Sequence, residues 1–186
     1  MRRAILLFSM ATAMLLLGSG VALADVFTGT EGPDEYTGPV DDDAITGLGG
    51  DDFLLGDPTP YGAGGDDALS GGEGRDEAYG GSGDDSVSGG LGNDDISGSL
   101  GSDIVDGGDG DDSLSDGPPF DVSTDLVFGG AGDDLIDAYN APAYEDVVYC
   151  GPGDDLVYTD GADRLIDCEA FVIAQEPDPW DLRYLN

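Results

Sequence analysis

The chain has 186 residues, of which 41 are acidic and 5 are basic, and it contains no histidine. A formal charge of −36 excludes nucleic acid and anionic membrane surfaces as partners, because both repel so negative a protein. Such a charge is typical of disordered chains, yet Ile, Leu and Val recur here at regular positions. We therefore expect a folded domain whose acidic residues are neutralised by bound cations.

The first 24 residues have the features of a secretory signal peptide. Arg2 and Arg3 precede an apolar run over residues 4–17, and the segment ends in Ala22-Leu23-Ala24, a small-residue pattern that suits signal peptidase. The run is short for a membrane span. We predict cleavage after Ala24, export of the rest of the chain and an extracellular location; an uncleaved N-terminal anchor is the alternative.

A nine-residue repeat runs through most of the remaining chain. Its clearest part, residues 71–115, consists of the five consecutive units GGEGRDEAY, GGSGDDSVS, GGLGNDDIS, GSLGSDIVD and GGDGDDSLS. The register extends in both directions through one Asp per unit. This series comprises Asp34, Asp43, Asp52, Asp67, Asp76, Asp85, Asp94, Asp103, Asp112, Asp125, Asp134, Asp146, Asp155 and Asp163.

An apolar or aromatic residue follows each series Asp by two positions, in all fourteen units. These residues are Tyr36, Ile45, Leu54, Leu69, Ala78, Val87, Ile96, Val105, Leu114, Val127, Ile136, Val148, Val157 and Leu165. Eleven of the fourteen units also carry Gly two positions before the Asp, the exceptions being Asp41, Ser123 and Tyr144. Such regularity indicates a repeat fold and not a chance pattern.

The nine-residue step is lengthened three times, to 15, 13 and 12 residues. The extra residues are rich in proline, and we expect them to form loops that bulge from single turns of the repeat. These insertions cover residues 57–61, 116–122 and 138–144. One repeat domain over residues 25–168 accommodates them on its outside.

Each unit predicts a short strand followed by a tight turn. In a segment such as Ser86-Val87-Ser88, the central side chain points to one face of a strand and its neighbours to the other. The glycines allow the chain to reverse, because they reach positive φ without a steric penalty. Two units form one coil of about 18 residues with its apolar side chains inside. We predict an all-β fold, a parallel β-roll or solenoid of about fourteen nonapeptide-type turns.

The stacked aspartates indicate calcium between these turns. The series Asp would recur on successive coils at about 4.8 Å, where two carboxylates repel by about 1 kcal/mol in water and by several times more in a partly dehydrated turn. Calcium takes 6–8 oxygen ligands at about 2.3–2.6 Å, whereas magnesium prefers a strict, water-rich octahedron. Softer metals need Cys or His, and the chain has two Cys and no His. We predict several calcium ions, with all fourteen series Asp as ligands.

Residues 71–115 resemble the RTX, or hemolysin-type, calcium-binding repeats, and the register covers about residues 29–167. In that family, loops 18 residues apart hold calcium in a parallel β-roll through the repeat Asp and nearby backbone carbonyls. The resemblance transfers well to Asp76, Asp85, Asp94, Asp103 and Asp112, and less directly to Asp43, Asp125 and Asp146, whose turns lack the preceding Gly. It implies helper carbonyls at Gly72, Gly74, Gly81, Gly83, Gly90, Gly92, Gly108 and Gly110.

Further acidic residues stand directly before several series Asp. Two roles are open for them: they ligate calcium, or they face solvent. The residues are Asp51, Asp66, Asp84, Asp111, Asp133 and Asp154.

The C-terminal part of the repeat predicts a disulfide and a cap. Cys150 and Cys168 are 18 residues apart, so stacking of coils would place their Cα atoms near 5 Å, and export favours oxidation; free thiols are the alternative. Residues 169–186 include Phe171, Val172, Ile173, Trp180 and Tyr184, and we expect them to cap the last coil; a partner-binding tail is the alternative.

Three functions follow from these features. The first is a secreted calcium-binding protein that folds only when it binds calcium. The second, an enzyme, is disfavoured because the chain lacks His for a catalytic triad, a G-x-S-x-G elbow and an H-E-x-x-H zinc helix. The third is a calcium-dependent cell-surface adhesin or matrix protein that uses the proline-rich insertions as recognition loops.

Overall fold

A computed structural model describes residues 24–59, 61–141 and 143–173. Within these ranges the chain forms sixteen strands and no helix, hence no helix that could span a membrane. The predicted signal peptide, apart from Ala24, lies outside the described residues, as do Trp180 and Tyr184 of the predicted cap.

The strands form two eight-stranded sheets in which every neighbouring pair is parallel. Sheet A contains the odd-numbered strands β1 (Val26–Thr28), β3 (Ala44–Gly49), β5 (Ala68–Glu73), β7 (Ser86–Leu91), β9 (Ile104–Asp109), β11 (Leu126–Ala131), β13 (Val147–Tyr149) and β15 (Arg164–Ile166). Sheet B contains the even-numbered strands β2 (Glu35–Thr37), β4 (Phe53–Leu55), β6 (Glu77–Ser82), β8 (Asp95–Leu100), β10 (Ser113–Ser115), β12 (Leu135–Ala138), β14 (Leu156–Thr159) and β16 (Ala170–Ile173).

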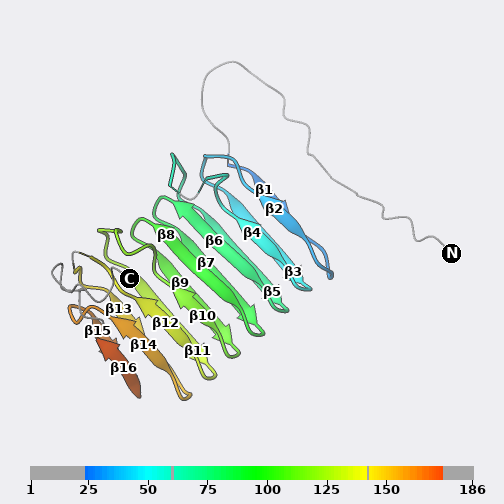
Figure 1. Ribbon diagram of the computed structural model, residues 1–186. Coiled ribbons are helices and arrows are strands. Elements are labelled where there is room, and N and C mark those ends of the chain that lie inside the picture. The colour runs from blue at the N-terminus through cyan, green and yellow to red at the C-terminus, as the bar shows by residue number, and fades with distance from the viewer. Residues whose placement is uncertain (1–23, 60, 142, 174–186) are drawn as a thin grey trace, which may run out of the picture.

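The chain alternates between the two sheets, so one strand of each sheet makes a coil and the coils stack into a roll (Figure 1). The prediction of a parallel β-roll is confirmed, but the count of about fourteen turns is corrected to about eight full turns. The difference arises because each full turn uses two nonapeptides. Two further strands, β1 and β16, flank the predicted repeats: Phe27 pairs with Ile45 and Phe171 with Val157 in the register of the series.

The core is a narrow double row of the apolar residues that follow the series Asp. Twelve of the fourteen predicted residues are buried, and the other two, Tyr36 and Leu165, pack against them at the two ends of the roll. The rings of Phe27 and Tyr36 stack with centroids 4.1 Å apart and cover the N-terminal end of the core. At the other end, Phe171 of β16 is 56% exposed, because no further coil within the described residues packs on it.

The two long edges of the roll differ. The turns that lead from sheet A to sheet B are short, and we call this side the regular edge. The turns that lead from sheet B to sheet A contain all three insertions, after β4, β10 and β12, and we call this side the insertion edge. In Figure 1 the regular edge lies at the lower right and the longer loops lie at the opposite ends of the strands.

The three insertions contact one another along that edge. The ring of Tyr61 in the first insertion packs against Phe120 in the second, with centroids 5.5 Å apart. The backbone N–H of Ala141 in the third insertion donates to the carbonyl of Pro119, at 2.6 Å. The prediction of separate bulging loops therefore understates their order, since they form one continuous layer.

The predicted disulfide is present between Cys150 and Cys168, whose Cα atoms are 5.0 Å apart. Cys150 follows β13 and Cys168 follows β15, so the bond joins the last two turns of the regular edge. It fastens the end of the stack at which the repeat becomes irregular.

Candidate metal centre

The fourteen series Asp fall into two columns of seven, one along each edge of the roll. The column of the regular edge contains Asp34, Asp52, Asp76, Asp94, Asp112, Asp134 and Asp155. The column of the insertion edge contains Asp43, Asp67, Asp85, Asp103, Asp125, Asp146 and Asp163. The three members whose turns lack the preceding Gly, Asp43, Asp125 and Asp146, all lie on the insertion edge.

A ladder of hydrogen bonds runs along each column. In each column the backbone N–H of every Asp except the last donates to Oδ1 of the Asp one coil further on, over 2.7–3.1 Å. The ladder of the insertion edge begins one coil earlier, where the N–H of Asp25 donates to Asp43. In thirteen of the fourteen, all except Asp34, one carboxylate oxygen therefore ties two coils together.

The second oxygen, Oδ2, has no hydrogen-bond partner in twelve of the fourteen. These twelve side chains are at most 3% exposed, so water does not solvate the free oxygen as it would on an open surface. The exceptions are the terminal members Asp34 and Asp163, whose Oδ2 accepts from the hydroxyls of Thr30 and Thr159. A buried carboxylate oxygen without a partner is costly, and twelve stacked copies are suited to binding cations.

The first glycine of each turn makes room for this oxygen. A Cβ at Gly89 would collide with Oδ2 of Asp94 and would lie 2.7 Å from the carbonyl oxygen of Gly107 on the next coil. The equivalent atom at Gly80 would collide with Oδ2 of Asp85 and lie 2.6 Å from the carbonyl oxygen of Gly98. Carboxylate and carbonyl oxygens thus surround a space that only glycine leaves open, and the sequence did not single out these first-position carbonyls.

The eight glycines with predicted helper carbonyls lie elsewhere in the same turns. All of them have positive φ, from +107° to +149°, which explains the requirement for glycine there. Their carbonyls stack along the roll: that of Gly72 faces the Cα of Gly90, and that of Gly90 faces Gly108. Their role as calcium ligands remains a prediction.

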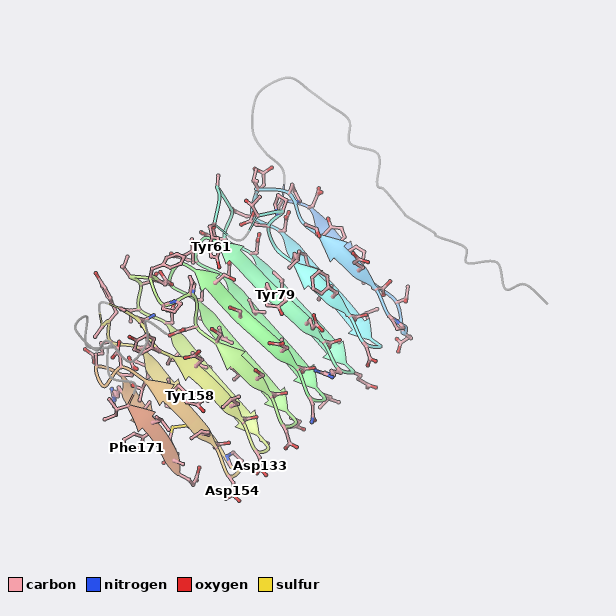
Figure 2. All side chains as sticks on the ribbon, in the orientation of Figure 1. Tyr61, Tyr79, Asp133, Asp154, Tyr158 and Phe171 are labelled. Atoms are coloured by element: carbon pink, nitrogen blue, oxygen red, sulfur yellow. A yellow bond between two sulfur atoms is a disulfide. The ribbon has the colours of Figure 1, made fainter. Side chains whose placement is uncertain are left out.

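The acids that precede the series Asp have a structural task. Oδ1 of Asp66 accepts from the backbone N–H of Asp84 at 3.0 Å, and Oδ1 of Asp133 accepts from that of Asp154 at 2.9 Å. In the same way, Oδ1 of Asp51, of Asp84 and of Asp111 each accepts from a backbone N–H on the next coil. Figure 2 shows Asp133 and Asp154 on neighbouring turns at the rim of the roll. These exposed side chains form a second ladder, which runs in the opposite direction to the inner one.

Three buried aspartates in the insertions are outside the predicted series. Asp57 is 4% exposed, accepts from the N–H of Ser82 at 3.0 Å and keeps Oδ1 free of partners. Asp116 and Asp121 are 0% and 4% exposed, and each has an unpartnered Oδ2. The repeat register could not identify them, because insertions have no period; the only signal was Asp116 at a position where most units carry glycine.

Burial without a cation shifts the acidity of the columns. It raises the pKa of Asp103 to about 9 and those of Asp67, Asp85 and Asp125 to about 7, although in each case a hydrogen bond from a backbone N–H opposes the shift. Neighbouring carboxylates add to the increase: members of the same column raise the pKa of Asp67, Asp103 and Asp125, and acids outside the column raise that of Asp85. The metal-free turns therefore favour protonated side chains.

A parallel roll with columns of buried carboxylates along its edges defines a class of protein, the calcium-binding β-rolls. Residues 28–58, 61–96, 88–115 and 123–140 match the RTX calcium-binding nonapeptide repeat in four copies. The chain belongs to this family, which confirms the resemblance of the repeats. Among curated proteins, no match to the chain was found.

The residues present fit calcium. Twelve of the fourteen turns offer an unpartnered carboxylate oxygen, and backbone carbonyl oxygens lie beside it; these are the hard donors that this ion prefers. Calcium would supply positive charge between carboxylates that otherwise repel one another across coils.

Gly89 provides a test of the space beside Oδ2. In the calcium-loaded protein, Gly89→Ala should destabilise the fold by about 1–3 kcal/mol, because the new methyl group collides with the Asp94 carboxylate and with backbone. Thermal or denaturant unfolding would measure the loss. Gly32→Ala is the matched control, since a Cβ there meets nothing within 4 Å, and a change of less than about 0.5 kcal/mol is expected. Equal effects of the two substitutions would contradict this account.

The raised pKa values predict that acid stabilises the metal-free roll. Folded-state values of about 6–9 exceed the unfolded value of 3.8, so the folded chain binds more protons. This stability is complete below pH 3.8 and is lost as the pH rises through 6–9. Circular dichroism in chelator should show more β structure at pH 5 than at pH 8.5. More β structure at the higher pH would contradict the prediction.

Proposed function

We propose that the protein is secreted and that calcium drives its folding outside the cell. Calcium ions lie between successive turns on both edges, held by the twelve series Asp with a free Oδ2 and by backbone carbonyls of the turn glycines. The observation that carries the proposal is the pair of columns of buried, unpartnered carboxylate oxygens. Without cations, these columns would oppose the stacking that buries the core.

Secretion is supported by two independent features. Residues 1–24 have the order of charges, apolar residues and small residues of a signal peptide. The Cys150–Cys168 disulfide belongs to an oxidising compartment. Extracellular calcium modules commonly bind with a Kd of about 10⁻⁴–10⁻³ M, so the chain would stay open where calcium is scarce and close after export.

The experiment is a calcium titration of the oxidised chain from residue 25 to residue 186 at pH 8, followed by far-UV circular dichroism. We expect little β signal in chelator and a cooperative gain near 10⁻⁴–10⁻³ M calcium, with little gain from magnesium at the same concentration. A chain that is already folded in chelator, or that responds equally to both ions, would contradict calcium-driven folding.

A second candidate function, adhesion to a cell surface or matrix, is favoured by a hollow beside the insertions. It has a volume of about 410 Å³ and is lined by Tyr61, Tyr79, Asp95, Ser97, Ser99, Ser115, Gly117 and Pro118. Its floor is the outer face of sheet B, and the first and second insertions supply its walls. Figure 2 shows Tyr61 and Tyr79 near one another at this end of the strands.

The lining suits a neutral saccharide. Tyrosine rings offer flat apolar faces, while the serine hydroxyls and the Asp95 carboxylate offer hydrogen-bond partners for sugar hydroxyls. An anionic polysaccharide is a poor candidate, since a protein with a charge of −36 repels it.

A calcium-dependent pull-down on immobilised neutral polysaccharide tests this function. Tyr61→Ala removes one wall of the hollow and should weaken retention about tenfold or more, as loss of an aromatic anchor does. Tyr158→Ala is the control, because Tyr158 lies on the outer face of sheet B away from the hollow and is 38% exposed. Equal retention of both variants and the parent would remove the hollow as a binding site.

A further inference from the structure

Asp116 replaces glycine in a turn of the insertion edge. Leu114 and Ser115 of β10 pair with Ile96 and Ser97 of β8, so Asp116 occupies the place that Gly98 holds on the preceding coil. Gly98 stands five residues before Asp103, and a Cβ there would collide with the Asp103 carboxylate. The insertion places Asp116 nine residues before Asp125, so this turn holds a carboxyl group where the others hold none.

This carboxyl group meets two members of the column. Carboxylate oxygens of Asp116, Asp125 and Asp146 all lie within 4.8 Å of one another. Asp116 and Asp125 lie in the turn between β10 and β11, and Asp146 lies in the turn of the next coil; the three side chains are 0–2% exposed. Among the residues that the structure describes, no other group of three or more potential metal ligands brings its ligand atoms so close together.

The hydrogen bonds of the cluster leave oxygens free. Oδ2 of Asp116, Asp125 and Asp146 has no hydrogen-bond partner. The Oδ1 atoms of Asp125 and Asp146 are used by the ladder, in which they accept from the backbone N–H groups of Asp103 and Asp125. The free oxygens are therefore not needed to hold the fold together.

A fourth buried carboxyl group, outside the cluster, lies in the same insertion as Asp116. Asp121 is 4% exposed, and its Oδ1 accepts from the N–H of Val122 and the hydroxyl of Ser123, which fixes its orientation. Its Oδ2 has no partner and lies 3.2 Å from where a Cβ of Gly117 would be, next to Asp116. Burial raises the pKa of Asp125, a hydrogen bond from Asp103 lowers it, and the charges of Asp146 and Asp121 raise it further, to about 7.

The separations are within the reach of calcium. An ion with oxygens at 2.3–2.6 Å can join ligand atoms up to about 5 Å apart. Oxygens of the three carboxylates lie within 4.8 Å of one another, so one calcium ion can contact all three. A larger number of carboxylates also raises affinity for calcium.

We propose that Asp116, Asp125 and Asp146, together with Asp121, form an additional calcium site on the insertion edge, with more carboxylates and higher affinity than the sites of the repeat. The site shares Asp125 and Asp146 with the proposed calcium column. Asp116 and Asp121 belong to it alone, and they allow the two ideas to be tested separately. Because it has the most carboxylates, it is the first site to fill during a titration.

The test is equilibrium dialysis of the purified protein against calcium, which counts ions and resolves the tightest class. Asp116→Gly restores the residue found at the matching position, Gly98, and should therefore fold. Asp116→Gly and Asp116→Asn should each bind one calcium fewer than the parent and lose the tightest class. Asp121→Asn should keep the number and weaken that class about tenfold. Asp109→Asn, which removes an exposed charge on the regular edge, should bind like the parent.

If the Asp116 variants bind as many calcium ions as the parent, with the same affinity, the proposed site is wrong. The Asp116 carboxyl group would then share a proton with its neighbours instead of binding calcium. If those variants fail to fold in excess calcium, Asp121→Asn decides alone, and parental binding by it would overturn the site. A parent protein that binds no calcium would refute the proposed function itself. A parent that binds calcium with all sites equally weak would refute only the inference.

Discussion

The repulsion between stacked carboxylates governs this protein. A solenoid repeats each residue on the next coil, so an Asp in the repeat becomes a column of charges about 4.8 Å apart. Here one oxygen of each carboxylate is already committed to the backbone of a neighbouring coil, which fixes the spacing and prevents the charges from moving apart. The core of small aliphatic side chains is too narrow to overcome such repulsion alone. Neutralisation by cations or protons relieves this repulsion, which is the physical basis of the proposed folding on calcium.

Glycine serves two different ends in these turns. At positions such as Gly90 and Gly92 the backbone has φ of +115° and +128°, which other residues adopt at a cost. At Gly89 the backbone is ordinary, and the side chain is absent because a carboxylate and a carbonyl occupy its place. The motif GGxGxD thus combines a conformational requirement with a steric one. At Asp116 the steric requirement is relaxed, and the turn gains a carboxyl group.

Much of the fold could be predicted because the repeat ties each residue type to one environment. The spacing of the series Asp predicted that they stack, and the apolar residues two positions later were correctly predicted to form the core. The spacing of Cys150 and Cys168 correctly predicted their disulfide. All three insertions lie on one edge because successive units alternate between the two edges. This placement was not predicted, because every nonapeptide was treated as equivalent. The residues of the insertions, Asp57 and Asp121 among them, could not be placed, because their burial depends on contacts between loops that share no register. The opposite directions of the two ladders were also inaccessible, since both use the same residue type.

Those opposite ladders give the roll a polarity. The inner ladder satisfies the N–H of each Asp with a side chain from the following coil, while the outer ladder satisfies its N–H with one from the preceding coil. A fragment of the roll therefore ends in two unlike faces, each of which carries donors in one ladder and acceptors in the other. Two such faces complement each other only head to tail. A further coil added in the same orientation preserves this complementarity, so the roll can be lengthened coil by coil without leaving either ladder unpaired inside it.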